Sequence, residues 1–134
     1  MASPRIVIAT LGMDQHENGA IAVQRMLMES QMMTSYLGVL NTPANVIDHA
    51  QQFKADVIGI SCHSWEYLTL VPELLDLLKE REFDCSVVIG GSIITPKDSQ
   101  SMLAQGVDGV FDGTASQGQI VDSIRDLVIS KQDT

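Results

Sequence analysis

The stretch VIGIS, residues Val57–Ser61, decides the fold. Its apolar residues stand at consecutive positions rather than at every second one, which is typical of a strand that helices cover on both faces. Comparable short runs recur along the chain, and longer segments of helical period separate them. Besides VIGIS, the expected strands are Arg5–Ala9, Met33–Val39, Ser86–Gly90 and Gly109–Phe111.

Five expected helices lie between and after these strands. Thr42 and Thr95 each precede a proline, and a threonine followed by proline is a common way for a helix to begin. The alternation of strands and helices predicts an α/β fold, namely a flavodoxin-like, doubly wound, five-stranded parallel sheet with right-handed crossovers. The helices are expected at Gly19–Ser30, Pro43–Phe53, Leu68–Glu82, Lys97–Ala104 and Gln117–Ser130.

The length of 134 residues suits one domain, so residues 1–134 are expected to form a single unit with one core. Hydrophobic residues make up 45% of the chain, but no apolar run approaches the roughly 20 residues that a membrane span needs. Met1–Arg5 lacks the apolar stretch of a signal peptide. These features predict a soluble, cytoplasmic protein that does not bind a membrane.

The net charge of −9 would repel a phosphate backbone, so nucleic acid is not an expected partner. The two cysteines, Cys62 and Cys85, do not form a Cys-x-x-Cys pair. We expect both thiols to be reduced, because a chain with this much core needs no disulfide framework.

Ligands of an open parallel sheet bind outside the carboxyl ends of its strands, where the loops face each other. The loop after the first strand, Thr10–Gly19, contains Asp14, His16 and Gly19 in a D-x-H-x-x-G pattern. An imidazole nitrogen ligates a transition metal when a carboxylate on the other nitrogen holds the ring in the right tautomer. Taken alone, the pattern also fits a solvated histidine in a polar loop. The loops expected at the same end of the sheet are Ser61–Tyr67 and Gly90–Pro96.

Five segments have an order and spacing typical of one family. They are Asp14–Ala20 (DQHENGA), Asn41–Ala44 (NTPA), Ala55–Ser61 (ADVIGIS), Thr69–Leu74 (TLVPEL) and Val88–Ile94 (VIGGSII). Through them the chain resembles the cobalamin-binding domains of adenosylcobalamin-dependent mutases over nearly its whole length. The resemblance is greatest to the acyl-CoA (methylmalonyl-CoA-like) mutases and extends more distantly to glutamate mutase and corrinoid methyltransferases.

In that family the vitamin binds with its dimethylbenzimidazole base detached from cobalt, and a protein histidine takes the vacated lower position. The resemblance implies that His16 ligates the cobalt of adenosylcobalamin and that Asp14 is its hydrogen-bond partner. It also implies a slot for the displaced nucleotide tail, lined by Gly90 and Gly91, in which Ser61 bonds a benzimidazole nitrogen. The residues implied to contact the cofactor are Asp14, Gln15, His16, Glu17, Asn18, Gly19, Ser61, His63, Gly90, Gly91, Ser92 and Thr114.

The chain departs from the family pattern in two loops. His63 stands where the family motif S-x-L has leucine, and we expect it to perturb the nucleotide slot rather than to replace His16. Trp65 and Tyr67 are bulkier than the usual residues, and they would shield the corrin edge, meet a partner subunit or cover the third helix. After the fifth strand, the family turn Gly-x-Gly-Thr is replaced by Phe111–Thr114 (FDGT), which is one residue shorter.

The resemblance implies the small subunit of a mutase, an isomerase that works as a heteromer with a TIM-barrel large subunit. The partner would bind the acyl-CoA substrate, because a barrel alone needs about 250 residues. The expected docking edge comprises Trp65, Tyr67 and the rim at Glu17 and Asn18. Two other functions stay open. One is a corrinoid carrier of a methyltransferase system, although such carriers usually place a helical bundle before this domain. The other is a cobalamin-free signalling or structural domain of the same fold.

Overall fold

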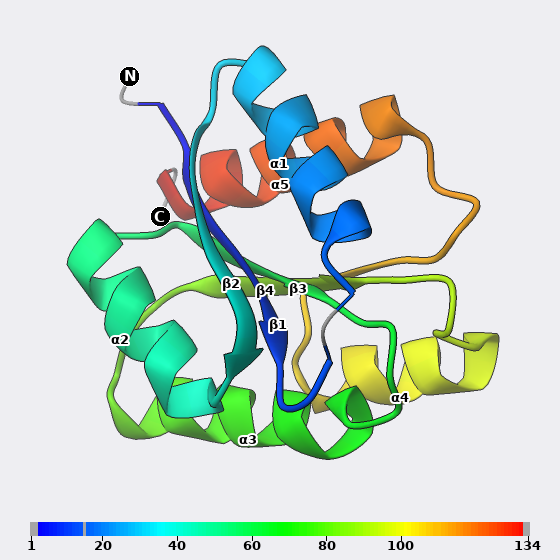
Figure 1. Cartoon of the computed structure of the whole chain (residues 1–134). Coiled ribbons are helices and arrows are strands. Elements are labelled where there is room, and N and C mark those ends of the chain that lie inside the picture. Colours follow the sequence, from blue (N-terminus) through cyan, green and yellow to red (C-terminus); the bar gives the residue numbers. More distant parts are fainter. Residues whose placement is uncertain (1–2, 15, 133–134) are drawn as a thin grey trace.

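The computed structural model describes residues 3–14 and 16–132, in which five strands alternate with five helices (Figure 1). The strands are β1 (Arg5–Leu11), β2 (Met33–Asn41), β3 (Val57–Ser61), β4 (Ser86–Gly90) and β5 (Gly109–Phe111). The helices are α1 (Asn18–Glu29), α2 (Pro43–Phe53), α3 (Tyr67–Glu80), α4 (Pro96–Gln105) and α5 (Gln117–Gln132).

The strands form a parallel sheet in the order β2-β1-β3-β4-β5. Helices α1 and α5 lie on one face of this sheet, and α2, α3 and α4 lie on the other (Figure 1). The predicted flavodoxin-like, doubly wound α/β fold is therefore confirmed. In this topology β1 and β3 are neighbours at the centre of the sheet, so the loops that follow them meet.

The apolar residues of β3 pack against the helices on both faces of the sheet. Ile58 and Ile60 pack in the cluster beneath α2 and α3, whereas Val57 packs in the cluster on the side of α1 and α5. Successive side chains of a strand point to opposite faces, so the apolar side chains of VIGIS reach both helical layers. Gly59 shares its face with Val57 and has no side chain, which leaves room between the sheet and α1.

Strands β1 and β2 each run two residues further than predicted, to Leu11 and Asn41. Thr10 and Leu11 are buried, and the Gly12 N–H donates a hydrogen bond to the Asn41 carbonyl (2.8 Å). Strand pairing thus continues into the predicted loop, which shrinks from Thr10–Gly19 to residues 12–17. The bounds of α1, α3, α4 and α5 differ from the predicted ones by one or two residues, since an apolar period does not fix the last residue of a helix.

Helix α2 begins at Pro43 as predicted, and α4 begins at Pro96, one residue before the predicted Lys97. The Thr42 hydroxyl accepts a hydrogen bond from the Asn45 N–H (3.1 Å), and the Thr95 hydroxyl accepts one from the Asp98 N–H (3.1 Å). A proline, which has no N–H to satisfy, occupies the first position of each helix.

Cys62 and Cys85 are free thiols. Burial raises the pKa of both groups, to about 12 for Cys85, so both are protonated and weakly nucleophilic at neutral pH.

In the part of the chain that the structure describes, none of the helices has the length and apolar character needed to cross a membrane.

Candidate functional site

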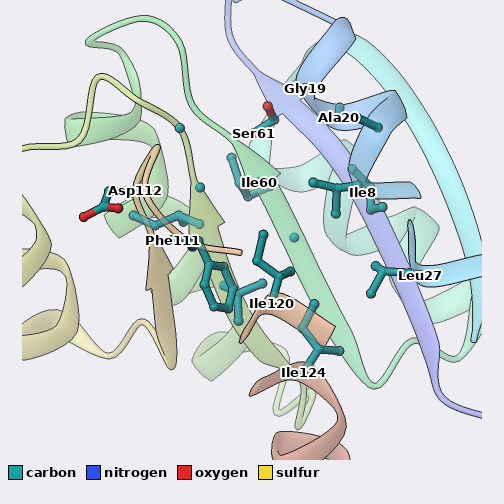
Figure 2. A pocket seen from close by; sticks show the side chains of 18 of the residues that line it. Ile8, Gly19, Ala20, Leu27, Ile60, Ser61, Phe111, Asp112, Ile120 and Ile124 are labelled. Atoms are coloured by element: carbon teal, nitrogen blue, oxygen red, sulfur yellow. The ribbon is translucent and has the colours of Figure 1, made fainter. Parts of the chain in front are cut away.

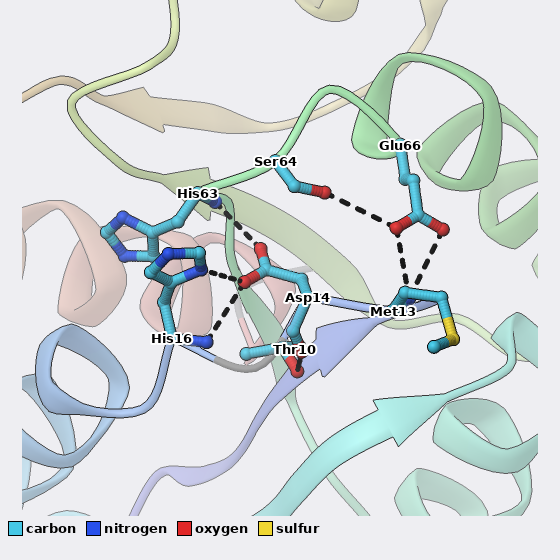
Figure 3. Close-up of polar contacts among 7 residues, drawn as sticks. All are labelled: Thr10, Met13, Asp14, His16, His63, Ser64 and Glu66. Atoms are coloured by element: carbon cyan, nitrogen blue, oxygen red, sulfur yellow. Dashed lines mark hydrogen bonds and ion pairs between the residues drawn. The ribbon is translucent and has the colours of Figure 1, made fainter.

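Loops from three strands meet at the carboxyl end of the sheet. They are residues 12–17 after β1, residues 62–66 after β3 and residues 91–95 after β4. The Cys62 N–H donates a hydrogen bond to the Gly90 carbonyl (2.7 Å), which joins the second loop to the end of β4. The Glu66 carboxylate accepts hydrogen bonds from the Met13 N–H (3.1 and 3.2 Å), which ties the first loop to the second (Figure 3).

Asp14 positions His16 and connects the same two loops (Figure 3). Its Oδ1 accepts hydrogen bonds from Nδ1 of the His16 ring (2.8 Å) and from the His16 backbone N–H (3.1 Å), and its Oδ2 accepts one from the His63 backbone N–H (2.8 Å). The predicted Asp14–His16 hydrogen bond is therefore present. Because an ionised carboxylate only accepts, Nδ1 carries a proton, and in the neutral ring Nε2 then keeps its lone pair. The His16 side chain is 65% exposed, so this lone pair is open to an incoming metal.

The Asp14 carboxyl is buried, with 4% of its surface exposed. Burial alone would raise its pKa. The hydrogen bonds from the His63 backbone, the His16 ring and the His16 backbone outweigh burial, and the pKa of Asp14 lies below its usual value. The carboxylate is thus ionised at neutral pH and holds the imidazole in one tautomer.

Two further polar residues hold Asp14 in place. The buried Thr10 hydroxyl donates a hydrogen bond to the Asp14 carbonyl (2.9 Å), and the Asn41 side-chain amide donates to the Thr10 carbonyl (3.1 Å). Neither residue was predicted to serve the site. For Thr10 the available signal was a polar residue near the end of an apolar strand.

A cavity of about 450 Å³ lies between the sheet and helices α1 and α5 (Figure 2). It reaches the Asp14–His16 pair through His63, which lines it and whose ring lies beside the His16 ring. Its inner part is apolar, and its end toward the loops has polar side chains. The inner part is lined by Ile6, Ile8, Leu27, Val88, Ile120 and Ile124. The polar side chains on the lining are those of Ser61, His63 and Asp112.

Glycines keep the wall of this cavity free of side chains. Gly90 and Gly91 line it, as predicted for the slot, together with Gly19, Gly59 and Gly113. Gly91 has a φ of 154°, and a Cβ there would overlap the carbonyl group of Cys62. A Cβ at Gly90 would lie 3.3 Å from the Phe111 carbonyl oxygen. The two glycines therefore allow β4 to approach its neighbours and also leave the cavity open.

Ser61 and His63 direct polar atoms toward the start of α1. A Cβ at Gly19 would lie 3.1 Å from His63 Nε2 and 3.7 Å from Ser61 Oγ, so the two atoms approach the same point. The His63 ring also lies beside the His16 ring, with centroids 5.4 Å apart and planes tilted by 38°. The His63 imidazole and the Ser61 hydroxyl make no hydrogen bond with residues 3–14 or 16–132.

Four other predicted contact residues lie exposed at the rim and do not line the cavity: Glu17, Asn18, Ser92 and Thr114. The Glu17 carboxylate accepts a hydrogen bond from the Tyr36 hydroxyl (2.8 Å); burial, helped by this carboxylate, raises the pKa of Tyr36 to about 12. The Thr114 backbone N–H and hydroxyl donate to the Asp112 carboxylate (2.8 and 2.5 Å), which lowers the pKa of Asp112. Gln15, also predicted, lies outside the described residues.

Tyr67 was predicted as part of a docking edge, and this prediction is wrong. Its side chain is 2% exposed and packs in the cluster beneath α2 and α3, and its hydroxyl donates a hydrogen bond to Asp98 (3.4 Å). Tyr67 is the first residue of α3, where the turn of the helix directs the side chain inward. Trp65, two residues earlier in the loop, is 57% exposed.

Solved structures with a similar fold include a cobalamin-binding protein from Desulfitobacterium hafniense and the signal receiver domain of the response regulator NarL from Mycobacterium tuberculosis. The first has a TM-score of 0.81 at 22% identity and covers 93% of this chain and 59% of that chain. The second has a TM-score of 0.73 at 17% identity and covers 95% of this chain and 97% of that chain. At such identities these structures show a shared fold and nothing more.

Sequence comparisons identify the family. The chain is 34% identical to the 2-hydroxyisobutanoyl-CoA mutase small subunit of Aquincola tertiaricarbonis, over 95% of this chain and 93% of that protein. It is 28% identical to the pivalyl-CoA mutase small subunit of Xanthobacter autotrophicus, over 92% of this chain and 82% of that protein. It is 31% identical to the ethylmalonyl-CoA mutase of Cereibacter sphaeroides over 80% of its length, but spans only 16% of that protein. The family model of the B12 binding domain matches residues 4–120, and the chain therefore belongs to the B12-binding domain family.

Proposed function

We propose that this chain is the cobalamin-binding small subunit of an adenosylcobalamin-dependent acyl-CoA mutase. His16 would be the lower ligand of cobalt, with the cofactor's own base displaced into the cavity. The observation that carries this proposal is the Asp14–His16 pair beside a cavity with glycine walls. Family membership and the likeness to two mutase small subunits of similar length support it.

The residues present fit the lower side of such a cofactor. Asp14 accepts the proton of Nδ1, so His16 offers cobalt one neutral nitrogen, Nε2. A carboxylate behind a metal-bound histidine fixes its tautomer and raises its basicity. One protein nitrogen is sufficient, because a corrin ring already surrounds its cobalt.

The cavity fits the displaced nucleotide tail. Its end near the loops carries the Ser61 hydroxyl, which would donate to a nitrogen of the base, and its inner part is apolar. Gly90 and Gly91 leave the path from the loops clear of side chains. A flat aromatic base would bury apolar surface there and satisfy the Ser61 hydroxyl.

Bound adenosylcobalamin supplies the radical chemistry of a carbon-skeleton rearrangement, and the protein supplies position and environment. In this chain Asp14 and His16 would hold the lower face, and the loops around them would exclude water from it. A TIM-barrel large subunit would cover the upper face and bind the acyl-CoA substrate. Two observations support a separate large subunit: the chain matches small subunits over most of their length, and it matches only 16% of ethylmalonyl-CoA mutase.

Nitrogen-15 labelling of histidine tests the ligation. In the cobalt(II) form of the cobalamin complex, the electron paramagnetic resonance spectrum should show hyperfine coupling to a protein nitrogen that changes on labelling. His16→Ala should abolish this coupling. His49→Ala is the matched control, because His49 lies on α2 and its Nε2 is 2.7 Å from the Ser35 hydroxyl, away from the cavity. A wild-type spectrum that labelling leaves unchanged would contradict axial ligation by histidine.

A further inference from the structure

The His63 side chain has no role in the function proposed above, although it lines the cavity. Its Nε2 and the Ser61 hydroxyl approach the same point near Gly19, and neither side chain has a hydrogen-bond partner in the part of the chain that the structure describes. By contrast, the third polar residue of the lining, Asp112, already accepts two hydrogen bonds from Thr114. The cavity therefore presents two adjacent polar side chains whose partners have to come from a ligand or from water.

The surroundings of His63 make an unpaired imidazole unfavourable once a ligand displaces water. The side chain is partly buried, and the cavity wall below it is formed by aliphatic residues such as Ile60 and Val88. A polar group that loses water without gaining a partner weakens binding, whereas a ligand that supplies the partner binds more tightly. His63 should consequently distinguish ligands by the polar groups that they bring to this point.

We propose that His63 shifts the selectivity of the cavity toward a cofactor with a purine base, relative to an apolar residue at the same position. A purine such as adenine has ring nitrogens and an exocyclic amine at its edge, whereas dimethylbenzimidazole has two methyl groups on its outer ring. A neutral imidazole offers one donor and one acceptor, which match the polar edge of a purine and not the methyl groups. This inference rests on the proposed function, in which the displaced base occupies the cavity.

The matched variants are His63→Leu and His63→Gln. Leucine removes the hydrogen-bonding capacity and supplies an apolar surface for the methyl groups. Glutamine removes the ring but keeps a donor and an acceptor. If His63 acts by hydrogen bonding, glutamine should retain the preference for the purine and leucine should lose it.

Equilibrium binding provides the readout, and it needs no enzymatic activity. Trp65 is the single tryptophan of the chain and lies exposed in the loop that contains His63, so quenching of its fluorescence by a bound corrinoid should report occupancy. Three probes are titrated into each full-length variant: hydroxocobalamin, the cobamide with adenine as its base, and cobinamide, which lacks the base. Visible absorbance of the corrinoid gives an independent measure of binding.

For each chain, the affinity for the adenine cobamide is divided by the affinity for hydroxocobalamin. This ratio should be about 3- to 10-fold higher in the wild-type chain than in His63→Leu, which corresponds to the free energy of one neutral hydrogen bond. Cobinamide should bind all three chains equally. The same affinity ratio in wild-type and His63→Leu chains would overturn the inference. So would an equal loss for all three probes in His63→Leu, because His63 would then act on His16 rather than on the base. If no corrinoid binds the wild-type chain, the proposed function itself fails.

Discussion

Asp14 accepts three hydrogen bonds, two from His16 and one from the His63 backbone. Asp14→Asn removes the charge and introduces an amide that donates, so it no longer selects the Nδ1–H tautomer of His16. We expect cobalamin affinity to fall by about 10- to 100-fold, the usual effect of losing such a partner behind a metal ligand. Absorbance titration with hydroxocobalamin measures the change.

Asp56→Asn is the control for Asp14→Asn. Asp56 also accepts a hydrogen bond from a backbone N–H, that of Arg5 (2.9 Å), but it lies at the amino end of β3. Its substitution should leave the affinity for cobalamin unchanged. An unaltered affinity in Asp14→Asn would show that the carboxylate does not orient the ligand.

Gly91 is constrained by its neighbours as well as by its backbone angle. Because a Cβ would overlap the Cys62 carbonyl, Gly91→Ala should lower the free energy of unfolding by at least about 2 kcal/mol, as overpacking of a tight site does. Gly118→Ala is the matched substitution, since a Cβ at this position of α5 meets nothing within 4 Å. Urea unfolding should show a large loss only for Gly91→Ala, and equal midpoints would contradict the close approach of the two loops.

At the scale of elements, α2 ends in a strained residue. Lys54 follows the helix with a φ of 58°, a left-handed conformation that favours glycine. Lys54→Gly should raise the free energy of unfolding by about 0.5–1 kcal/mol, whereas Lys54→Ala should not raise it. Urea unfolding of the two variants tests this. Because Lys54 lies before β3, at the end of the sheet away from the loops of the site, neither variant should change cobalamin affinity.

At the scale of the whole molecule, the proposed function requires a second subunit over the loops of the site. If a barrel subunit covers the loops, the isolated chain should bind cobalamin weakly and have no mutase activity. Mixing it with a candidate large subunit from the same organism should give activity on acyl-CoA substrates. Trp65→Ala should weaken assembly, because an exposed aromatic residue beside a ligand site commonly anchors an interface. Activity of the 134-residue chain alone would contradict the two-subunit proposal.

The sequence by itself determined the order and type of the elements and the coverage of both faces of the sheet by helices. VIGIS predicts a strand covered on both faces because its apolar residues are consecutive, and the two threonine–proline pairs predict two helix starts because a cap involves residues only three positions apart. The Asp14–His16 hydrogen bond was predictable for the same reason, since both side chains belong to one short loop. Each of these features depends on neighbours in the chain.

Only the tertiary structure decided which distant residues share the site. The Asp14–His63 hydrogen bond, the hydrogen bond from Asn41 to Thr10, and the burial of Tyr67 join segments that lie far apart in the sequence. The cavity likewise exists because glycines of β3 and β4 face side chains of α1 and α5. Local patterns do not predict these contacts, because they depend on which strands become neighbours in the sheet and on how closely the helices pack against it.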